Sequence, residues 1–327
     1  MKIGKKIKRA FFRRVIKPSI IEVYQKEDSI ADMPGVITAN DLSPTRFDIP
    51  MSIIERVEQG KDQSLMISRT MPTMRSNIKN IKFSIDSIDK NSDKPKDTID
   101  DDFLQQLKEY CKTLGAAKIG FTKLPRQLIF KDKAVLHDNA IVLVLEMDKA
   151  LIALAPHRKT IVMIMDTYNK LGIIANKVAT FLRNHGYSAH ASHPLGGIVL
   201  YPPLAKKAGL GWFGRHGLLI TPEFGPSVRL AAVFTNITNL PFSTENPHEW
   251  IPNYCATCGK CIKNCPPKAI YDQPKQHENG RLTHIDNKKC FPFLSEEYGC
   301  TICIKVCPFN TVGYDELFTK TMNRKAK

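Results

Sequence analysis

The stretch from residue 255 to residue 266 reads Cys255-Ala-Thr-Cys258-Gly-Lys-Cys261-Ile-Lys-Asn-Cys265-Pro266, with the spacing C-x2-C-x2-C-x3-C-P. A second group, Cys300-x2-Cys303-x3-Cys307-Pro308, repeats this spacing without its first member. Cys290, ten residues upstream of the second group, supplies the thiol that this group lacks. Eight thiols therefore lie in the last quarter of the chain, and their spacing predicts two equivalent metal centres there.

This spacing is typical of bacterial ferredoxins, in which three thiolates bind one 4Fe-4S cluster and the fourth binds its neighbour. Short steps wrap the chain around three corners of a cluster, and the longer step carries the next sulfur away. We therefore expect two clusters with crossed ligands. The first set is Cys255, Cys258, Cys261 and Cys307, and the second set is Cys265, Cys290, Cys300 and Cys303.

Two other interpretations of the cysteines are disfavoured. Structural zinc favours paired C-x2-C units rather than a triple run that ends in Cys-Pro. Disulfide bonds are rare in the cytosol, where thiols stay reduced. The ninth cysteine, Cys111, lies in a predicted helix, where we expect a buried apolar residue rather than a ligand.

The composition of the chain is that of an ordinary globular protein. Its 327 residues are 43% hydrophobic and 24% charged, enough for about two domains and too apolar for a mainly disordered chain. No apolar run approaches the roughly 18 residues of a membrane-spanning helix. We expect a cytoplasmic protein that is not integral to a membrane.

The positive charge is concentrated at the amino end. The chain carries 48 Lys and Arg against 32 Asp and Glu, and residues 1–26 hold nine bases and one acid. Ile3, Ile7, Phe11 and Val15 recur every fourth residue, which predicts an apolar stripe on a basic helix. Two interpretations stay open: a peripheral contact with an anionic membrane or an acidic partner, and a solvated basic arm packed on its own domain. No DNA-binding signature accompanies the charge.

Residues 1–101 are predicted to form this basic arm and a linker. Four prolines interrupt residues 27–74, so we expect an extended segment with one short helix near 53–59. The polar stretch 86–102 is the predicted linker.

An α/β pattern predicts a second domain over residues 102–245 and a third, cysteine-rich domain over 246–327. Periodicity predicts helices over 103–114 and 160–185. Apolar runs predict strands over 117–121, 140–146, 217–221 and 229–234, and the second of these is apolar enough for a buried central strand.

The segment Gly209-Leu-Gly211-Trp-Phe-Gly214 matches the spacing G-x-G-x-x-G. A dinucleotide site needs a strand before these glycines and a helix after them. Here a lysine-bearing segment (204–208) precedes them and the strand-like 217–221 follows, so the pattern does not predict a dinucleotide site. The glycines instead predict a bend where the backbone passes close to a large flat ligand or to another segment of the chain.

The segment from Pro202 to Thr235 contains Ala208-Gly-Leu-Gly-Trp-Phe-Gly-Arg-His-Gly-Leu-Leu-Ile-Thr-Pro-Glu-Phe-Gly-Pro-Ser-Val-Arg-Leu230 and closely resembles corrinoid-dependent reductive dehalogenases. The related epoxyqueuosine reductases share the Ala-Gly-Leu-Gly-Trp element and the eight-cysteine arrangement. The resemblance covers residues 160–310. It implies an α+β protein, with a nitroreductase-like α/β domain for base-off cobalamin and a ferredoxin-like domain whose two 4Fe-4S clusters feed it electrons.

The resemblance also implies roles for particular residues. Tyr168 falls at the position of the proton donor, and Arg229 at that of the basic residue that favours its phenolate form. The residues implied in corrinoid binding are Gly209, Gly211, Gly214, Arg215, His216, Leu218 and Thr221. The implied reaction removes a halide or another leaving group from a small organic substrate, with a ferredoxin or flavodoxin as electron donor.

The chain departs from its relatives around residue 196. Gly196 stands where dehalogenases usually carry Asn, and Leu195-Gly196-Gly197 stands where epoxyqueuosine reductases carry an essential Asp. Ala191 replaces the Asp of the motif that binds cobalt through histidine, so His193 is not expected to ligate cobalt. For His190, His193 and His216, a polar contact in the pocket and a purely structural role both stay open.

Two alternative functions remain. One is an epoxyqueuosine reductase-like enzyme that modifies tRNA, and failure to restore queuosine in a deficient host would argue against it. The other is a 4Fe-4S electron-transfer protein without corrinoid, and measurement of corrinoid uptake separates it from the enzyme.

Overall fold

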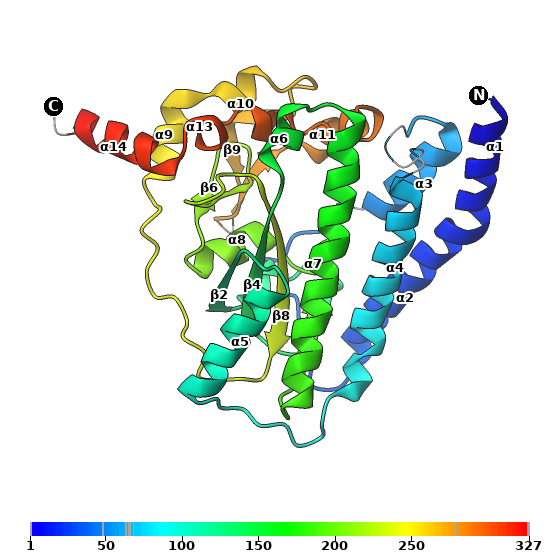
Figure 1. Cartoon of the computed structure of the whole chain (residues 1–327), viewed down its shortest axis with the longest axis vertical. Coiled ribbons are helices and arrows are strands. Elements are labelled where there is room, and N and C mark those ends of the chain that lie inside the picture. Colours follow the sequence, from blue (N-terminus) through cyan, green and yellow to red (C-terminus); the bar gives the residue numbers. More distant parts are fainter. Residues whose placement is uncertain are drawn as a thin grey trace.

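The computed structural model describes residues 2–325 except 48, 63, 65, 66, 68 and 279, and the side chains of residues 2–5, 50, 324 and 325 also lie outside the description. Figure 1 shows a central sheet and the long green helix beside it, with the blue and cyan N-terminal helices on one side. The cysteine-rich segment, in yellow to red, lies across the top of this assembly.

The central sheet is antiparallel, with the strand order β2-β4-β8-β5. Its strands are β2 (Lys118–Lys123), β4 (Asn139–Glu146), β5 (Ala189–Ser192) and β8 (Val228–Thr235). Ile141 of β4 lies opposite both Phe121 and Val233, which fixes the register of the three longer strands. All of β4 is buried except Glu146, so the apolar run of this segment marks the central strand that the sequence predicts.

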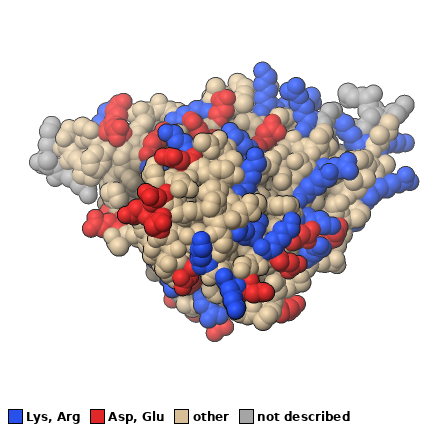
Figure 2. Space-filling model, turned by 60° about the horizontal axis from the view of Figure 1, so that its bottom comes forward, with Lys and Arg blue, Asp and Glu red and all other residues tan. Residues whose placement is uncertain are grey.

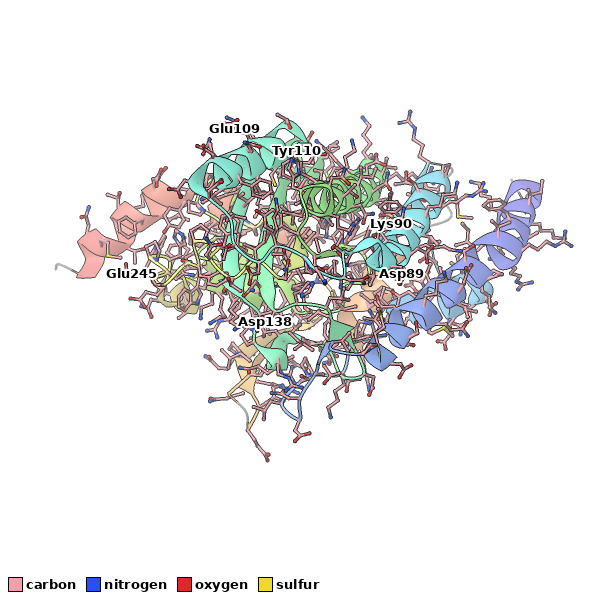
Figure 3. The ribbon with its side chains drawn as sticks, turned by 90° about the horizontal axis from the view of Figure 1, so that it is seen from below. Asp89, Lys90, Glu109, Tyr110, Asp138 and Glu245 are labelled. Carbon is pink, nitrogen blue, oxygen red and sulfur yellow. The ribbon has the colours of Figure 1, made fainter. Side chains whose placement is uncertain are left out.

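Helices cover both faces of the sheet. Ile141 and Leu143 share one core cluster with residues of α5 (Asp101–Thr113) and α7 (Arg158–Asn184). Val142 and Val144 point the other way, onto α8 (Tyr201–Lys207). This alternation follows from the two-residue period of a strand. Seen from below, α5, α7 and α4 (Thr70–Asp86) form a row of helices, with Tyr110 and Glu109 on α5 (Figure 3).

The predicted helices and strands of this region are present. The predicted helices 103–114 and 160–185 are α5 and α7, and the predicted strands 117–121, 140–146 and 229–234 are β2, β4 and β8. The predicted strand 217–221 is shorter, because only β7 (Leu219–Ile220) pairs with β6 (Trp212–Phe213). The first strand of this hairpin lies within the glycine motif and the second follows it, so a strand rather than a helix comes after the glycines.

The N-terminal region is helical and packed rather than extended. It contains α1 (Lys2–Phe11), a π-helical turn (Phe12–Ile16), α2 (Lys17–Asp28), α3 (Ile49–Gln59) and α4. Phe12, Ile16 and Ile20 are buried with Ile78 of α4 and Ile161 of α7 in one core cluster. The predicted short helix is present as α3, but the expectation of an extended segment is wrong at α4. Pro72 stands in the first turn of α4, where the ring costs no hydrogen bond.

The remaining elements are short. β1 (Ile37–Thr38) pairs with β3 (Ala134–Val135), and α6 (Lys149–Ala153) precedes α7. The cysteine-rich segment contains α9 (Ile251–Cys258), α10 (Lys260–Lys263), β9 (Ile270–Gln276), β10 (Leu282–Ile285), α11 (Asn287–Glu296), α12 (Ile302–Lys305), α13 (Pro308–Thr311) and α14 (Tyr314–Lys325). Across the described part of the chain, no helix is long and apolar enough to cross a membrane.

Candidate functional site

The first predicted cysteine set surrounds a single small pocket. Its four members come from α9, from α10 and from the residue before α13, and they line this pocket together with Pro308 and Phe309. Gly259 joins α9 to α10 in the left-handed conformation, at φ 61°, which glycine adopts without steric cost. The turn brings Cys258 and Cys261 to the same side of the chain, so that both line the pocket.

The second predicted set also gathers in space. The thiols of Cys290 and Cys300 interact electrostatically with that of Cys265, and Cys303 interacts with all three. Cys303 interacts with Cys261 of the first set as well, so the two sets are adjacent. The geometry thus agrees with crossed ligation, and the role of each cysteine as a ligand stays a prediction.

The thiols of both sets are poorly solvated. Burial raises the pKa of Cys255 to about 12 and that of Cys290 to about 11, and neighbouring thiols add to both shifts. A buried group of thiolates is stable only beside positive charge, which iron ions supply. The two thiol groups therefore fit the iron–sulfur clusters that their spacing predicts.

Tyr168 and Arg229 form a contact between α7 and β8. The Arg229 guanidinium carbon lies 3.7 Å from the centre of the Tyr168 ring, over its face. Nη2 of Arg229 donates a hydrogen bond to the Met147 sulfur at 3.2 Å, and Nε is buried with no partner among the described residues. The structure therefore brings together Tyr168 and Arg229, the two residues for which the resemblance implies catalytic roles. It leaves the Nε donor of Arg229 without a hydrogen bond among the described residues.

Tyr168 shares an apolar cluster with one cysteine of the second set. Tyr168, Leu218 and Cys303 are half-buried and pack against the same apolar cluster. Cys307 of the first set instead belongs to a cluster built around Trp250. Tyr168 thus shares its packing with Cys303 rather than with Cys307.

The glycine-rich bend packs against its own chain. A Cβ at Gly211 would lie 2.1 Å from the carbonyl oxygen of Ile220, and one at Gly209 would lie 2.6 Å from the Ser243 hydroxyl oxygen. At Gly214 the Cβ would meet the His216 ring at 2.6 Å. Of the two interpretations of these glycines, the structure favours close passage of another chain segment, and the three positions offer no open cradle for a macrocycle.

The other residues implied in corrinoid binding make internal contacts. Arg215 donates to the Gln273 side chain at 2.8 Å. The Thr221 hydroxyl donates to the Gly225 carbonyl and accepts from the Phe224 amide. Leu218 alone keeps a half-exposed apolar side chain near Tyr168. Contact of these residues with a corrinoid stays a prediction.

Three histidines are buried near this region. Burial lowers the pKa of His190 and of His193 to about 3 and that of His216 to about 4, so all three imidazoles are neutral at pH 7. Nδ1 of His193 accepts from the Leu195 amide, and the opposite edge of its ring abuts Gly172, where a Cβ would lie 1.9 Å from Nε2. These contacts favour a structural role for His193.

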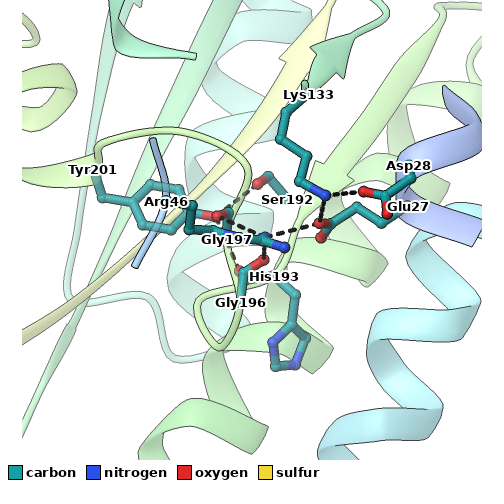
Figure 4. A network of polar contacts seen from close by, with 9 residues as sticks. All are labelled: Glu27, Asp28, Arg46, Lys133, Ser192, His193, Gly196, Gly197 and Tyr201. Atoms are coloured by element: carbon teal, nitrogen blue, oxygen red, sulfur yellow. Dashed lines mark hydrogen bonds and ion pairs between the residues drawn. The ribbon is translucent and has the colours of Figure 1, made fainter. Parts of the chain in front are cut away.

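A buried network of charges, which sequence reasoning missed, joins α2 to the turn at Gly196 (Figure 4). The Glu27 carboxylate contacts Arg46 at 2.8 Å and Lys133 at 3.1 Å, and Asp28 also contacts Lys133. Arg46 donates to the Gly196 carbonyl at 3.0 Å. No local sequence signal marks this network, because its members lie far apart in the chain.

A second hydrogen-bonded group holds the same turn from the other side. The Tyr201 hydroxyl lies 2.6 Å from the Ser192 hydroxyl and donates to the His193 carbonyl at 3.0 Å. Burial raises the pKa of Tyr201, so the phenol stays protonated. The segment from His193 to Gly196 is thus held by Arg46 on one side and by Tyr201 on the other.

The fold and the cysteine sites define a protein of two parts, an α/β domain followed by a ferredoxin-like dicluster domain. Residues 254–311 match the family model described as a 4Fe-4S dicluster domain. Cys111, by contrast, is fully buried in the core of the α/β domain, as the sequence predicts.

Within this class, the chain is similar to reductive dehalogenases. It is 34% identical over 183 residues to tetrachloroethene reductive dehalogenase from Sulfurospirillum multivorans, covering 53% of this chain and 35% of the relative. It is 35% identical over 128 residues to epoxyqueuosine reductase from Listeria monocytogenes, covering 36% of this chain and 31% of the relative. The aligned segments thus span about a third of the curated relatives.

Solved structures show the same fold. The catabolic reductive dehalogenase NpRdhA matches with a TM-score of 0.65 at 20% identity, over 89% of this chain and 45% of that one. A reductive dehalogenase whose structure suggested a mechanism for B12-dependent dehalogenation matches with a TM-score of 0.59 at 22% identity, over 75% of this chain and 39% of that one. The predicted resemblance and the predicted fold class are both confirmed.

Proposed function

We propose that this chain is an iron–sulfur reductase that uses a corrinoid to remove a halide, or another leaving group, from a small organic molecule. The observation that carries the proposal is the contact between Tyr168 and Arg229, in which Tyr168 packs against the same apolar cluster as Cys303 of the second set. Similarity to tetrachloroethene reductive dehalogenases supports the reaction class.

Tyr168 is the proposed proton donor to the substrate carbon. The Arg229 guanidinium lies over the face of the Tyr168 ring and fixes the position of the phenol. Replacement of a leaving group by hydrogen consumes two electrons and one proton, and Tyr168 delivers the proton.

In this proposal a ferredoxin or flavodoxin would supply the electrons, and the clusters held by the two cysteine sets would carry them. A bound corrinoid supplies a low-potential cobalt centre for loss of the leaving group. The unpartnered Nε of Arg229 and the half-exposed side chain of Leu218 fit contacts to such a group, whereas the three glycines of the bend do not.

Substitution of Tyr168 tests the proposed reaction. In anaerobically reconstituted protein, Tyr168→Phe should lower the rate of reduction of a halogenated substrate by at least about 100-fold, because the proton donor is lost. Iron content and corrinoid content should stay unchanged. Tyr110→Phe is the matched control, since Tyr110 stacks on Phe181 on the far side of the sheet from the bend. Full activity of Tyr168→Phe would exclude Tyr168 as the donor.

A second candidate, an electron-transfer protein without corrinoid, is supported by the filled glycine bend. The two candidates differ in the absorbance spectrum after incubation with cobalamin and removal of free ligand. Retained corrinoid supports the reductase, and iron and sulfide alone support the electron-transfer protein. The tRNA-modifying alternative requires restoration of queuosine in a deficient host.

A further inference from the structure

The N-terminal helix presents two apolar faces, and its own domain covers only one of them. Phe12 and Ile16 are buried against α4 and α7. Ile7 is 64% exposed and Phe11 is 38% exposed, so the apolar stripe that the sequence predicts on this helix faces outward. Ile3, the first residue of the predicted stripe, lies outside the described side chains. A π-helical turn follows at Phe12–Ile16. Such a turn holds one residue more than an α-helical turn, so it shifts the buried face of Phe12 and Ile16 relative to the exposed face of Ile7 and Phe11.

The outward face borders a groove of about 540 Å³ between α1 and α4. Ile7, Phe11, Met71 and Pro72 form its apolar lining. Its charged lining residues are all cationic, namely Lys8, Arg75 and Lys79. The groove thus combines an apolar lining with positive charge.

The charged residues in the segments that form this groove are all basic. Residues 2–16 and 70–85, which include α1 and most of α4, together carry ten Lys or Arg residues and no Asp or Glu. Figure 2 shows Lys and Arg side chains gathered at the end of the molecule that carries the N-terminal helices. Elsewhere on the face in view, both acidic and basic side chains are present.

We propose that this region, formed by α1 and the adjoining end of α4, binds the surface of an anionic lipid bilayer. A helix with exposed apolar side chains flanked by cations lies in the plane of a membrane interface, with its apolar face at the boundary between headgroups and acyl chains. Here Ile7 and Phe11 enter the bilayer, and Arg75 and Lys79 contact lipid phosphates. The absence of acids from both segments suits a continuous anionic surface. The proposal is independent of the reaction that the protein catalyses.

Sedimentation with vesicles tests the proposal. The full-length holoprotein should bind vesicles that contain phosphatidylglycerol and phosphatidylcholine, and should not bind vesicles of phosphatidylcholine alone. Binding should weaken as salt is added, because ions screen the contact between Lys or Arg and phosphate. Failure to bind the anionic vesicles at low salt would overturn the proposal and favour an acidic partner protein.

Apolar substitutions separate insertion from simple charge attraction. The double variant Ile7→Ser, Phe11→Ser should bind anionic vesicles about tenfold more weakly than the unchanged protein, since two partly buried apolar side chains are lost. Leu282→Ser is the matched control, because Leu282 is 48% exposed on β10 and should not affect binding. Equal binding by the double variant and the control would contradict insertion.

Charge substitutions and a spectroscopic probe complete the test. Arg75→Gln combined with Lys79→Gln should weaken binding, whereas Lys108→Gln combined with Lys112→Gln on α5 removes the same charge and should leave it unchanged. In Phe11→Trp, the new indole should shift its emission to shorter wavelength on addition of anionic vesicles. An unshifted emission in vesicle-bound protein would place this side chain in water and overturn the proposal.

Discussion

At the scale of single residues, the structure stands out for buried polar groups that have few partners. His190 of β5 is 3% exposed, and its Nδ1 has no partner among the described residues. Its neutrality follows mainly from burial, with smaller contributions from His137 and Arg183. Protonation would place a charge in the buried contact between the sheet and α4.

Acid should therefore destabilise the protein through His190. Burial lowers its pKa from 6.5 to about 3 in the folded state, so the unfolded chain binds this proton first. The stabilising contribution is complete above pH 6.5 and is lost as the pH falls from there towards 3. His190→Gln should flatten the decline in the free energy of unfolding by about 1.4 kcal/mol per pH unit below pH 6.5. Urea titrations of the unchanged protein and of His190→Gln at several pH values measure this difference. Identical pH profiles of the two proteins would contradict the prediction.

At the scale of elements, the network around Glu27 shows that α2 belongs to the folded core. The Glu27 side chain is 6% exposed and faces Arg46 and Lys133, which are 16% and 8% exposed. A charge buried in this way depends on its partners, since removal of one ion leaves the others without compensation. At the surface, Lys26 of α2 forms an ion pair with Asp86 of α4, and both side chains are about 40% exposed.

Substitutions at these two neighbouring positions should differ sharply. Glu27→Gln should lower the free energy of unfolding by about 3 kcal/mol, because Lys133 and Arg46 lose a buried carboxylate. Lys26→Gln should change it by less than about 1 kcal/mol, because water screens an exposed pair. Thermal and urea unfolding of the two variants measure the difference. Equal losses of stability in Glu27→Gln and Lys26→Gln would contradict the assignment of α2 to the folded core.

Local patterns predicted the α/β elements well and the N-terminal elements poorly. The uninterrupted apolar run of β4 and the long period of α7 reflect burial that repeats along each segment, so a single sequence reveals them. In α4 the same periodicity is present, but Pro72 resembles a helix breaker unless its place in the first turn is known. The antiparallel order of the sheet depends on contacts between distant strands, which no local pattern specifies.

At the scale of the whole molecule, crossed ligation makes the two halves of the cysteine-rich domain interdependent. Cys307→Ser should remove the first cluster and lower the iron content from about eight to about four per chain. The cluster that remains in Cys307→Ser should give the same spectrum as the cluster that remains in Cys258→Ser. This spectrum should differ from that of Cys303→Ser, which retains the other cluster. Mössbauer spectroscopy and iron analysis measure this outcome, and Cys111→Ala should retain about eight irons. A Cys307→Ser spectrum like that of Cys303→Ser would contradict crossed ligation.

The candidate site was predictable where spacing or resemblance carries information. Cysteine spacing predicted two sets that the structure gathers separately, and resemblance pointed to Tyr168 and Arg229, which touch. The glycine bend was ambiguous, because a missing side chain makes room equally for a ligand and for the chain itself. The Glu27–Arg46–Lys133 network could not be foreseen, since single charged residues give no sign of their distant partners.

The packing of α4 also bears on the order in which the molecule assembles. α4 rests on α7 and β5, which leave the ribosome long after it. Asp28 and Lys133, joined in the buried network, are separated by 105 positions. α4 thus reaches its final place only after α7 and β5 have been synthesised, and until then its apolar side chains depend on chaperones or on transient contacts within the nascent chain.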